Sequence, residues 1–213
     1  MSLRLGPIHN WLYNQIQLIE DREVKIIDAF KNKYDSNEID AIVSPLRDKF
    51  GQLKGETPLE EMIGDSHIHP WLETAITAAQ TREAAVVKEL MDRYDDQDLL
   101  DDVYQKHAEE LANKVSQGKS DDLETAFKLL KDSLLERMPC DRLSAVVKEE
   151  ANEIVWKHNI RLHTEFWKEA GASIELMHQL YSSWIESFMT AINSDIKHQR
   201  QIEDDYYQDT FTL

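Results

Sequence analysis

An internal repeat of sixty residues is the feature that most constrains the fold of this chain. The segment at 8–12 (Ile-His-Asn-Trp-Leu) returns at 68–72 as Ile-His-Pro-Trp-Leu, with no gap. The same offset places the Arg-Glu of 22–23 over that of 82–83, and the Tyr-Asp of 34–35 over that of 94–95. A repeat at a fixed period is typical of a duplicated structural unit that cannot bury its apolar face alone. The sequence therefore predicts two equivalent helical units.

Apolar residues recur every three or four positions within each unit, which is the spacing of one face of a helix. The first such stripe runs from Ile8 to Phe30, and the second runs in the same phase from Leu72 to Leu90. Gly and Pro are scarce, at six and five residues, which favours an all-α protein. We therefore predict a bundle of long antiparallel helices with an internal duplication. The long helices are expected near residues 8–34, 69–94, 141–170 and 173–202, with shorter helices returning the chain.

The 213 residues allow one large domain or two small ones. We expect a single helical domain over 1–213 and a clear turn at 116–120. Its parts would be repeat unit one at 6–54, repeat unit two at 66–115, a C-terminal helical pair at 139–202 and an acidic tail at 203–213. The tail is expected to be frayed or docked on a neighbouring element.

The formal net charge is −17, which narrows the possible partners. A phosphate backbone or an anionic membrane surface would be repelled, so we expect neither nucleic acid nor membrane binding. Cys140 is the only cysteine, so no intramolecular disulfide can form. With no apolar run of eighteen residues and no visible secretory signal, the chain is expected to be cytoplasmic.

Histidines at matching helix starts form the first candidate site. If successive helices alternate in direction, His9 and His69 lie at one end of the bundle, where the last two helices also bring His163 and His178. Imidazole and carboxylate groups suit a transition metal such as iron or zinc. The expected metal-binding set is His9, His69, Glu73, His163, Glu175 and His178, and the expected cofactor-binding tryptophans are Trp11, Trp71 and Trp167.

A structural interpretation of the same residues stands beside the metal site. A histidine and a tryptophan in a first helical turn can seal the end of a core, with ring nitrogens bonded to free backbone groups. The spacing Glu175-x-x-His178 is found in di-iron bundles, but ferritin-like proteins need two such motifs and this chain has one. No family resemblance follows from these residues.

The repeated Arg-Glu pair forms the second candidate constellation. Glu23 and Glu83 fall within the apolar stripes, where a charge needs a partner or a metal. One hypothesis is a set of buried charge pairs, Glu23 with Arg82 and Glu83 with Arg22, related by a pseudo-twofold axis. The other is a pair of carboxylates in a cavity, with raised pKa values or a bound metal. These residues lie roughly 20 Å along the helix from His9, so the two constellations are separate.

Two functional hypotheses follow. The first is a metal- or cofactor-binding helical bundle with a His/Glu cluster at one end. The alternative is a non-catalytic acidic interaction module, or a homodimer without a metal, that uses the apolar last helix and the tail around Tyr206. Because no catalytic motif is present, the sequence does not decide whether the protein is an enzyme. His107, His158 and His198 lie among polar residues and are expected to be solvated.

Overall fold

The structure of this chain is a computed structural model that describes residues 6–55, 57–64, 66–116 and 122–213. Most of the turn expected at 116–120 lies outside these residues. The described residues form eight α-helices and a four-stranded antiparallel sheet. The prediction of an all-α fold is therefore wrong. The chain divides into two compact units, Met1–Asp96 with Phe166–Ala172, and Gln97–Glu165 with Ser173–Leu213. The single helical domain expected from the sequence stays a prediction beside this division.

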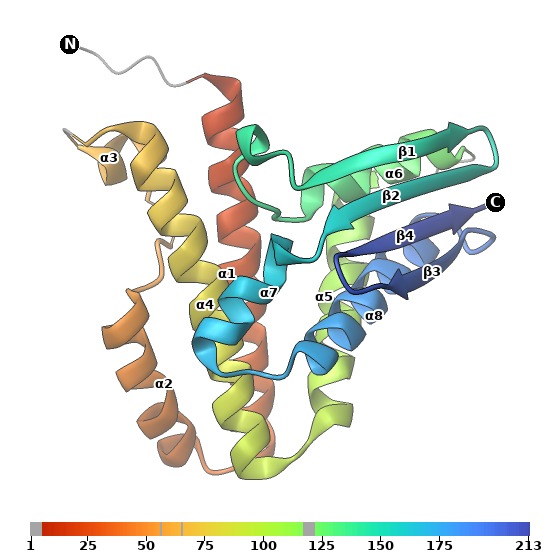
Figure 1. The fold of residues 1–213 in the computed structure, drawn as a ribbon. Coiled ribbons are helices and arrows are strands. Elements are labelled where there is room, and N and C mark those ends of the chain that lie inside the picture. The colour runs from red at the N-terminus through yellow and green to blue at the C-terminus, as the bar shows by residue number, and fades with distance from the viewer. Residues whose placement is uncertain (1–5, 56, 65, 117–121) are drawn as a thin grey trace. The chain divides into compact units, whose positions relative to one another are not determined.

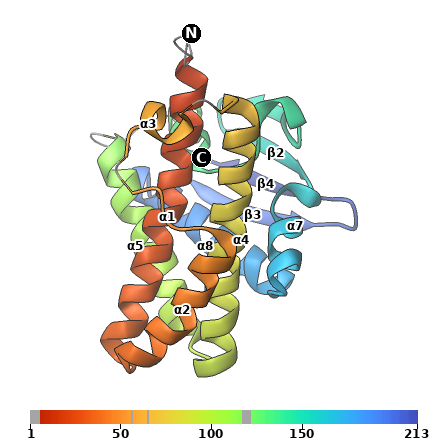
Figure 2. The ribbon, with the colours of Figure 1, turned by 90° about the vertical axis from the view of Figure 1, so that its left-hand side faces the viewer.

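The first unit contains the long helices of the repeat, and Figures 1 and 2 show them side by side. Its helices are α1 (Pro7–Lys33), α2 (Ser36–Phe50), α3 (Leu59–Ile63) and α4 (Ile68–Tyr94). His9 meets His69 where α1 and α4 begin, and Tyr34 stacks on Tyr94 where they end. The two helices therefore run in the same direction, as expected for the first and third of a series of helices that alternate in direction.

Local sequence explains where the helices of the first unit begin. Pro7 occupies the first turn of α1, where its missing N–H costs nothing. Asp35 caps α2 by accepting hydrogen bonds from the backbone N–H groups of Asn37 and Glu38. The helix continues through Pro45, although a proline inside a helix removes a backbone hydrogen bond and commonly bends it. Ion pairs Lys31–Asp40 and Arg47–Glu23 place α2 antiparallel to α1.

The second unit combines helices and the sheet. Its elements are α5 (Gln97–Ser116), α6 (Leu123–Ser133), a 3₁₀ turn (Pro139–Asp141), β1 (Ser144–Glu150), β2 (Glu153–Asn159), the first half of α7 (Arg161–Ala170), α8 (Ile174–Ile192), β3 (Lys197–Ile202) and β4 (Tyr206–Thr212). The strand order is β1-β2-β4-β3, and every neighbouring pair is antiparallel (Figure 1).

Two of the expected long helices are partly strands. The segment 141–170 forms β1, β2 and α7, and α8 ends at Ile192 so that the chain can continue as β3. In β2 and β4 the buried residues recur at every second position, because alternate side chains of a strand face the same side of the sheet. This period of two belongs to a strand and not to a helix. The tail at 203–213, expected to be frayed or docked on a neighbouring element, includes β4, a central strand paired with β2 and β3.

Helices α6 and α8 cover the inner face of this sheet. Phe127 of α6 contacts the rings of Trp156 on β2 and Phe211 on β4. His178 of α8 meets the ring of Tyr207 edge to face. The apolar stripe of α8, which the sequence offered as a docking surface, is mostly buried in this core: Met177, Tyr181, Trp184, Phe188, Ile192 and, beyond the helix end, Ile196. Among the described residues, we find no helix that combines the length and the apolar character needed to cross a membrane.

Candidate functional site

The repeated histidines meet at the N-terminal ends of α1 and α4. The Nε2 atoms of His9 and His69 lie 3.2 Å apart, at hydrogen-bonding distance. His9 Nδ1 accepts a hydrogen bond from the backbone N–H of Gly6, which satisfies one free donor of the helix end. Trp71, two residues after His69, packs its ring against Tyr13 of α1. Of these contacts, the bond from Gly6 to His9 has the form that the structural interpretation expects, whereas the His69 side chain is exposed and bonds His9.

The other two histidines of the expected cluster have partners inside the second unit. His163 Nε2 donates to the carbonyl of Leu135, and its Nδ1 accepts from the hydroxyl of Tyr207. Both ring nitrogens of His163 are thereby engaged. His178 is buried beside the same Tyr207. The structure therefore pairs His9 with His69, and it links His163 and His178 through Tyr207.

The expected metal-binding character is contradicted. Among residues 6–55, 57–64, 66–116 and 122–213, no group of three or more His, Cys, Asp or Glu side chains is placed to hold a metal ion. Glu73 and Glu175 are exposed, so neither joins the histidines as a buried ligand. Of the three tryptophans expected to flank a cofactor, Trp11 and Trp71 are half-buried and Trp167 is fully buried.

The repeated Arg-Glu residues form two buried ion pairs between α1 and α4. Arg22 binds Glu83 through two hydrogen bonds, of 2.6 and 2.8 Å. Arg82 binds Glu23 at 2.6 Å, and it also binds Glu20 at 2.9 Å and the carbonyl of Gly51 at 2.8 Å. All four repeated side chains are essentially inaccessible to solvent. Each arginine thus pairs with the glutamate of the other repeat.

The two pairs differ in their surroundings. Burial raises the pKa of Glu23, although the nearby Arg82 and Arg47 oppose that shift. Arg22 and Glu83 face each other in a bidentate pair of two hydrogen bonds. The pairing is therefore common to both repeats, and Arg82 also binds Glu20 and the carbonyl of Gly51.

A second buried polar cluster lies on the inner face of the sheet, and sequence reasoning missed it. At its centre Asp209 of β4 accepts two hydrogen bonds from Arg200, of 2.8 and 2.9 Å, and one of 2.7 Å from His198, both on β3. His158 of β2 lies 3.1 Å from the same carboxylate. Burial alone would raise the pKa of Asp209, but Arg200 and the imidazoles hold it well below its usual range.

Burial sets the protonation of the neighbouring groups of this cluster. It raises the pKa of the Tyr207 hydroxyl well above its ordinary value, so Tyr207 is the donor to His163. Burial also lowers the pKa of His178 to about 4, aided by Arg200 and opposed by Asp209. His158 and His198, expected to be solvated, are therefore parts of a buried network. His107 is buried too, and it accepts a hydrogen bond from the indole N–H of Trp184.

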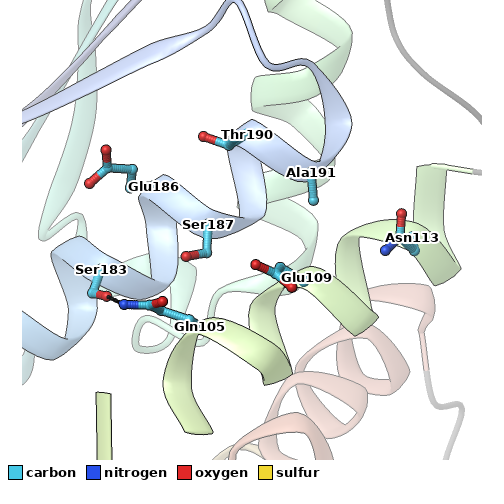
Figure 3. Close-up of a pocket in the computed structure, with 8 residues that line it drawn as sticks. All are labelled: Gln105, Glu109, Asn113, Ser183, Glu186, Ser187, Thr190 and Ala191. Atoms are coloured by element: carbon cyan, nitrogen blue, oxygen red, sulfur yellow. Dashed lines mark hydrogen bonds between the residues drawn. The ribbon is translucent and has the colours of Figure 1, made fainter. Parts of the chain in front are cut away.

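An exposed groove lies between α5 and α8, shown in Figure 3. The two helices run in the same direction, because Gln97 bonds Gln179 and, further along both, Gln105 bonds Ser183. Small residues on α8 leave room between them, and the groove has a volume of about 590 Å³. Its lining residues are Gln105, Glu109 and Asn113 of α5, and Ser183, Glu186, Ser187, Thr190 and Ala191 of α8.

The chemistry of this α5–α8 groove is polar and acidic. It presents hydroxyl groups, amides and the carboxylates of Glu109 and Glu186, and no lysine or arginine lines it. Neither carboxylate makes an ion pair with another described residue, although Lys106 on the same helix interacts with Glu109 electrostatically, and both side chains are exposed. Figure 3 shows Glu109 facing Ser187 across the groove. The groove can therefore accept a cationic, hydrogen-bonding ligand without displacing an internal partner.

Spacing could have found this groove only in part. Gln105, Glu109 and Asn113 follow one another at four-residue intervals, as do Ser183, Ser187 and Ala191. Such spacing predicts one polar face on each helix, but it does not say that the two faces adjoin.

No family model, curated protein or solved structure matches this chain.

Proposed function

We propose that this protein is a non-catalytic interaction module whose α5–α8 groove binds a basic segment of a partner protein. The observation that carries this proposal is the pair of exposed carboxylates, Glu109 and Glu186, that line an open groove without an ion-pair partner among the described residues. Cationic side chains of a partner would supply the missing charges.

The length of the groove favours a peptide segment. From Gln105 to Asn113 the lining advances eight residues along α5, which is about 12 Å at the rise of an α-helix. The residues from Ser183 to Ala191 cover the same length on α8. This span accommodates about four residues of an extended chain or about two turns of a helix. A compact small molecule is more commonly enclosed in a deeper pocket.

The charge of the whole chain supports the same partner chemistry. A net charge of −17 attracts basic partners over a Debye length and raises the rate of encounter. The hydroxyl and amide groups beside the two glutamates then offer hydrogen bonds to ammonium, guanidinium or backbone groups. Long-range attraction would bring many basic proteins near the surface, and the groove would select among them.

The test is a titration with a fluorescein-labelled twelve-residue peptide of alternating Lys and Ala, with a Glu/Ala peptide as the charge-reversed probe. We expect saturable binding of the basic peptide that weakens between about 50 and 500 mM salt, because the groove is exposed and screened. The double variant Glu109→Gln/Glu186→Gln should weaken binding about tenfold, the sum of two exposed ion pairs.

The matched control is Glu60→Gln/Glu61→Gln, which removes the same charge from exposed positions on α3. This control should change the dissociation constant less than about twofold. A second groove variant, Ser187→Lys, places a cation opposite Glu109 and should block the probe. Equal weakening by both double variants would reduce the interaction to general charge attraction and refute the groove as the site.

A further inference from the structure

A smaller cavity lies at one end of the sheet. It has a volume of about 290 Å³ and is lined by the loop before β1, by the start of β1, by the end of β2 and by the start of β4, and His158 of the Asp209 cluster is one of its lining residues. Alternation places Lys157 and Tyr206 on the outer face of the sheet, because Trp156 and Tyr207 point inward. The cavity is therefore formed entirely within the second unit.

Two cations line this cavity and neither makes an ion pair with another described residue. Arg142 and Lys157 make no ion pair with any other described residue, although acidic residues outnumber basic ones by 41 to 24 in the chain. Most other basic side chains of the second unit do have acidic partners, for example Arg137 with Glu165 and Lys148 with Glu153. In so acidic a protein, two unpaired cations at one cavity mark a place suited to an anion.

Local structure positions the Lys157 ammonium group and sets the backbone conformation at Arg142. Lys157 Nζ lies 3.5 Å from the centre of the Tyr206 ring, a cation–π contact that holds the ammonium group at the cavity wall. Arg142 has a φ of +52°, a left-handed conformation that non-glycine residues adopt infrequently. That conformation ends the 3₁₀ turn at Arg142 and leads the chain into β1.

The other lining residues favour a ligand with a single negative charge and an apolar body. Leu143, Ala145 and Val147 supply an apolar wall, and Val147 is 57% exposed at a bulge of β1. The carboxylate of Asp205 also lines the cavity, so its formal charge with Arg142 and Lys157 is +1. A single carboxylate balances that charge, whereas a phosphate dianion would exceed it.

We propose that this cavity binds a small monocarboxylate with an aromatic or short aliphatic body. Arg142 and Lys157 would bind the carboxylate, and the apolar wall with the Tyr206 ring would contact the body. A volume near 290 Å³ is at the lower end of ligand sites and fits a molecule of about benzoate size. This site is independent of the α5–α8 groove, because the two share no lining residue.

The experiment is a titration of the full chain with benzoate, followed by backbone amide shifts in ¹H–¹⁵N spectra. Benzamide and benzylamine serve as the neutral and cationic probes of the same shape. We expect saturable shifts at Val147, Lys157 and Tyr206 with benzoate, at least tenfold weaker binding of benzamide, and no binding of benzylamine. The proposal would be overturned if benzoate gave no saturable shift up to about 10 mM. It would also be overturned if benzamide bound as tightly as benzoate.

Substitutions distinguish binding at this cavity from nonspecific electrostatic attraction. Arg142→Gln/Lys157→Gln should weaken benzoate binding at least tenfold, while Lys128→Gln, at an exposed position of α6, should leave it unchanged. Val147→Glu, which adds an anion at an exposed side chain and is not expected to disturb the fold, should also weaken binding. Benzoate affinity that is the same in the double variant, in Val147→Glu and in the unmodified protein would contradict the assignment.

Discussion

His178 is a buried side chain whose ring nitrogens have no hydrogen-bond partner among the described residues. A polar group in this position costs stability, and the cost grows when the group is charged. The structure accordingly favours the neutral ring, because burial lowers its pKa to about 4. The sequence placed His178 in a metal site because of its spacing from Glu175, but spacing along a helix does not reveal what packs against it.

Acid should therefore weaken the fold through His178. Its pKa is about 4 in the folded chain and 6.5 in the ordinary case, so the unfolded chain takes up a proton first as the pH falls. The free energy of unfolding should decrease by up to about 1.4 kcal/mol per pH unit between those values from this group. The variant His178→Phe should show a smaller slope in urea unfolding between pH 6.5 and 4.5. An unchanged slope would contradict this role.

At the scale of elements, the repeat predicted more of the structure than any other signal. Helices α1 and α4 lie close to the expected ranges, and their Arg-Glu residues meet across the two helices. The reason is physical, because a charged residue on a buried stripe needs an opposite charge at the same depth, and the duplicate supplies it. Arg82, by contrast, also binds Glu20 and a backbone carbonyl, which no pattern in the sequence indicated.

The two repeated ion pairs should not be equally important for stability. Glu83→Gln removes a buried carboxylate that Arg22 binds through two hydrogen bonds, and we expect a loss of about 3 kcal/mol in the free energy of unfolding. Glu23→Gln removes a carboxylate with one hydrogen bond to Arg82 and should cost about half as much, because Arg82 keeps Glu20 and the carbonyl of Gly51. Urea unfolding of both variants at pH 7 measures the difference. Equal losses, or a larger loss for Glu23→Gln, would contradict the asymmetry.

The strands were missed because two periodicities coincide in this sequence. Ile192 and Ile196 are four residues apart and both buried, so the helical stripe of α8 continues past its true end at Asn193. Ile154 and His158 are also four apart, although both point inward from a strand. The available signal was the turn chemistry at 193–195, Asn-Ser-Asp, and at 204–205, Asp-Asp, which separates short segments rather than long helices.

At the scale of the whole molecule, the net negative charge links the composition of the chain to the proposed function. Forty-one acidic residues against 24 basic ones argue against nucleic acid from the sequence alone. They do not indicate where a basic partner would bind, because that depends on which helix faces adjoin. The α5–α8 groove answers this with two unpaired carboxylates beside hydroxyl and amide groups. Most of the titratable side chains that the sequence singled out as a metal site instead have structural partners or lie exposed.

The most direct test of the central claim is a map of the binding surface. Adding the Lys/Ala peptide to ¹⁵N-labelled protein should shift the backbone amides of Gln105, Glu109, Ser183 and Ser187 together, with a common saturation curve. The amides of Glu60 and Glu61 on α3 should stay unchanged at the same peptide concentrations. Shifts spread evenly over acidic positions of both units, or absent from α5 and α8, would contradict the groove as the binding site.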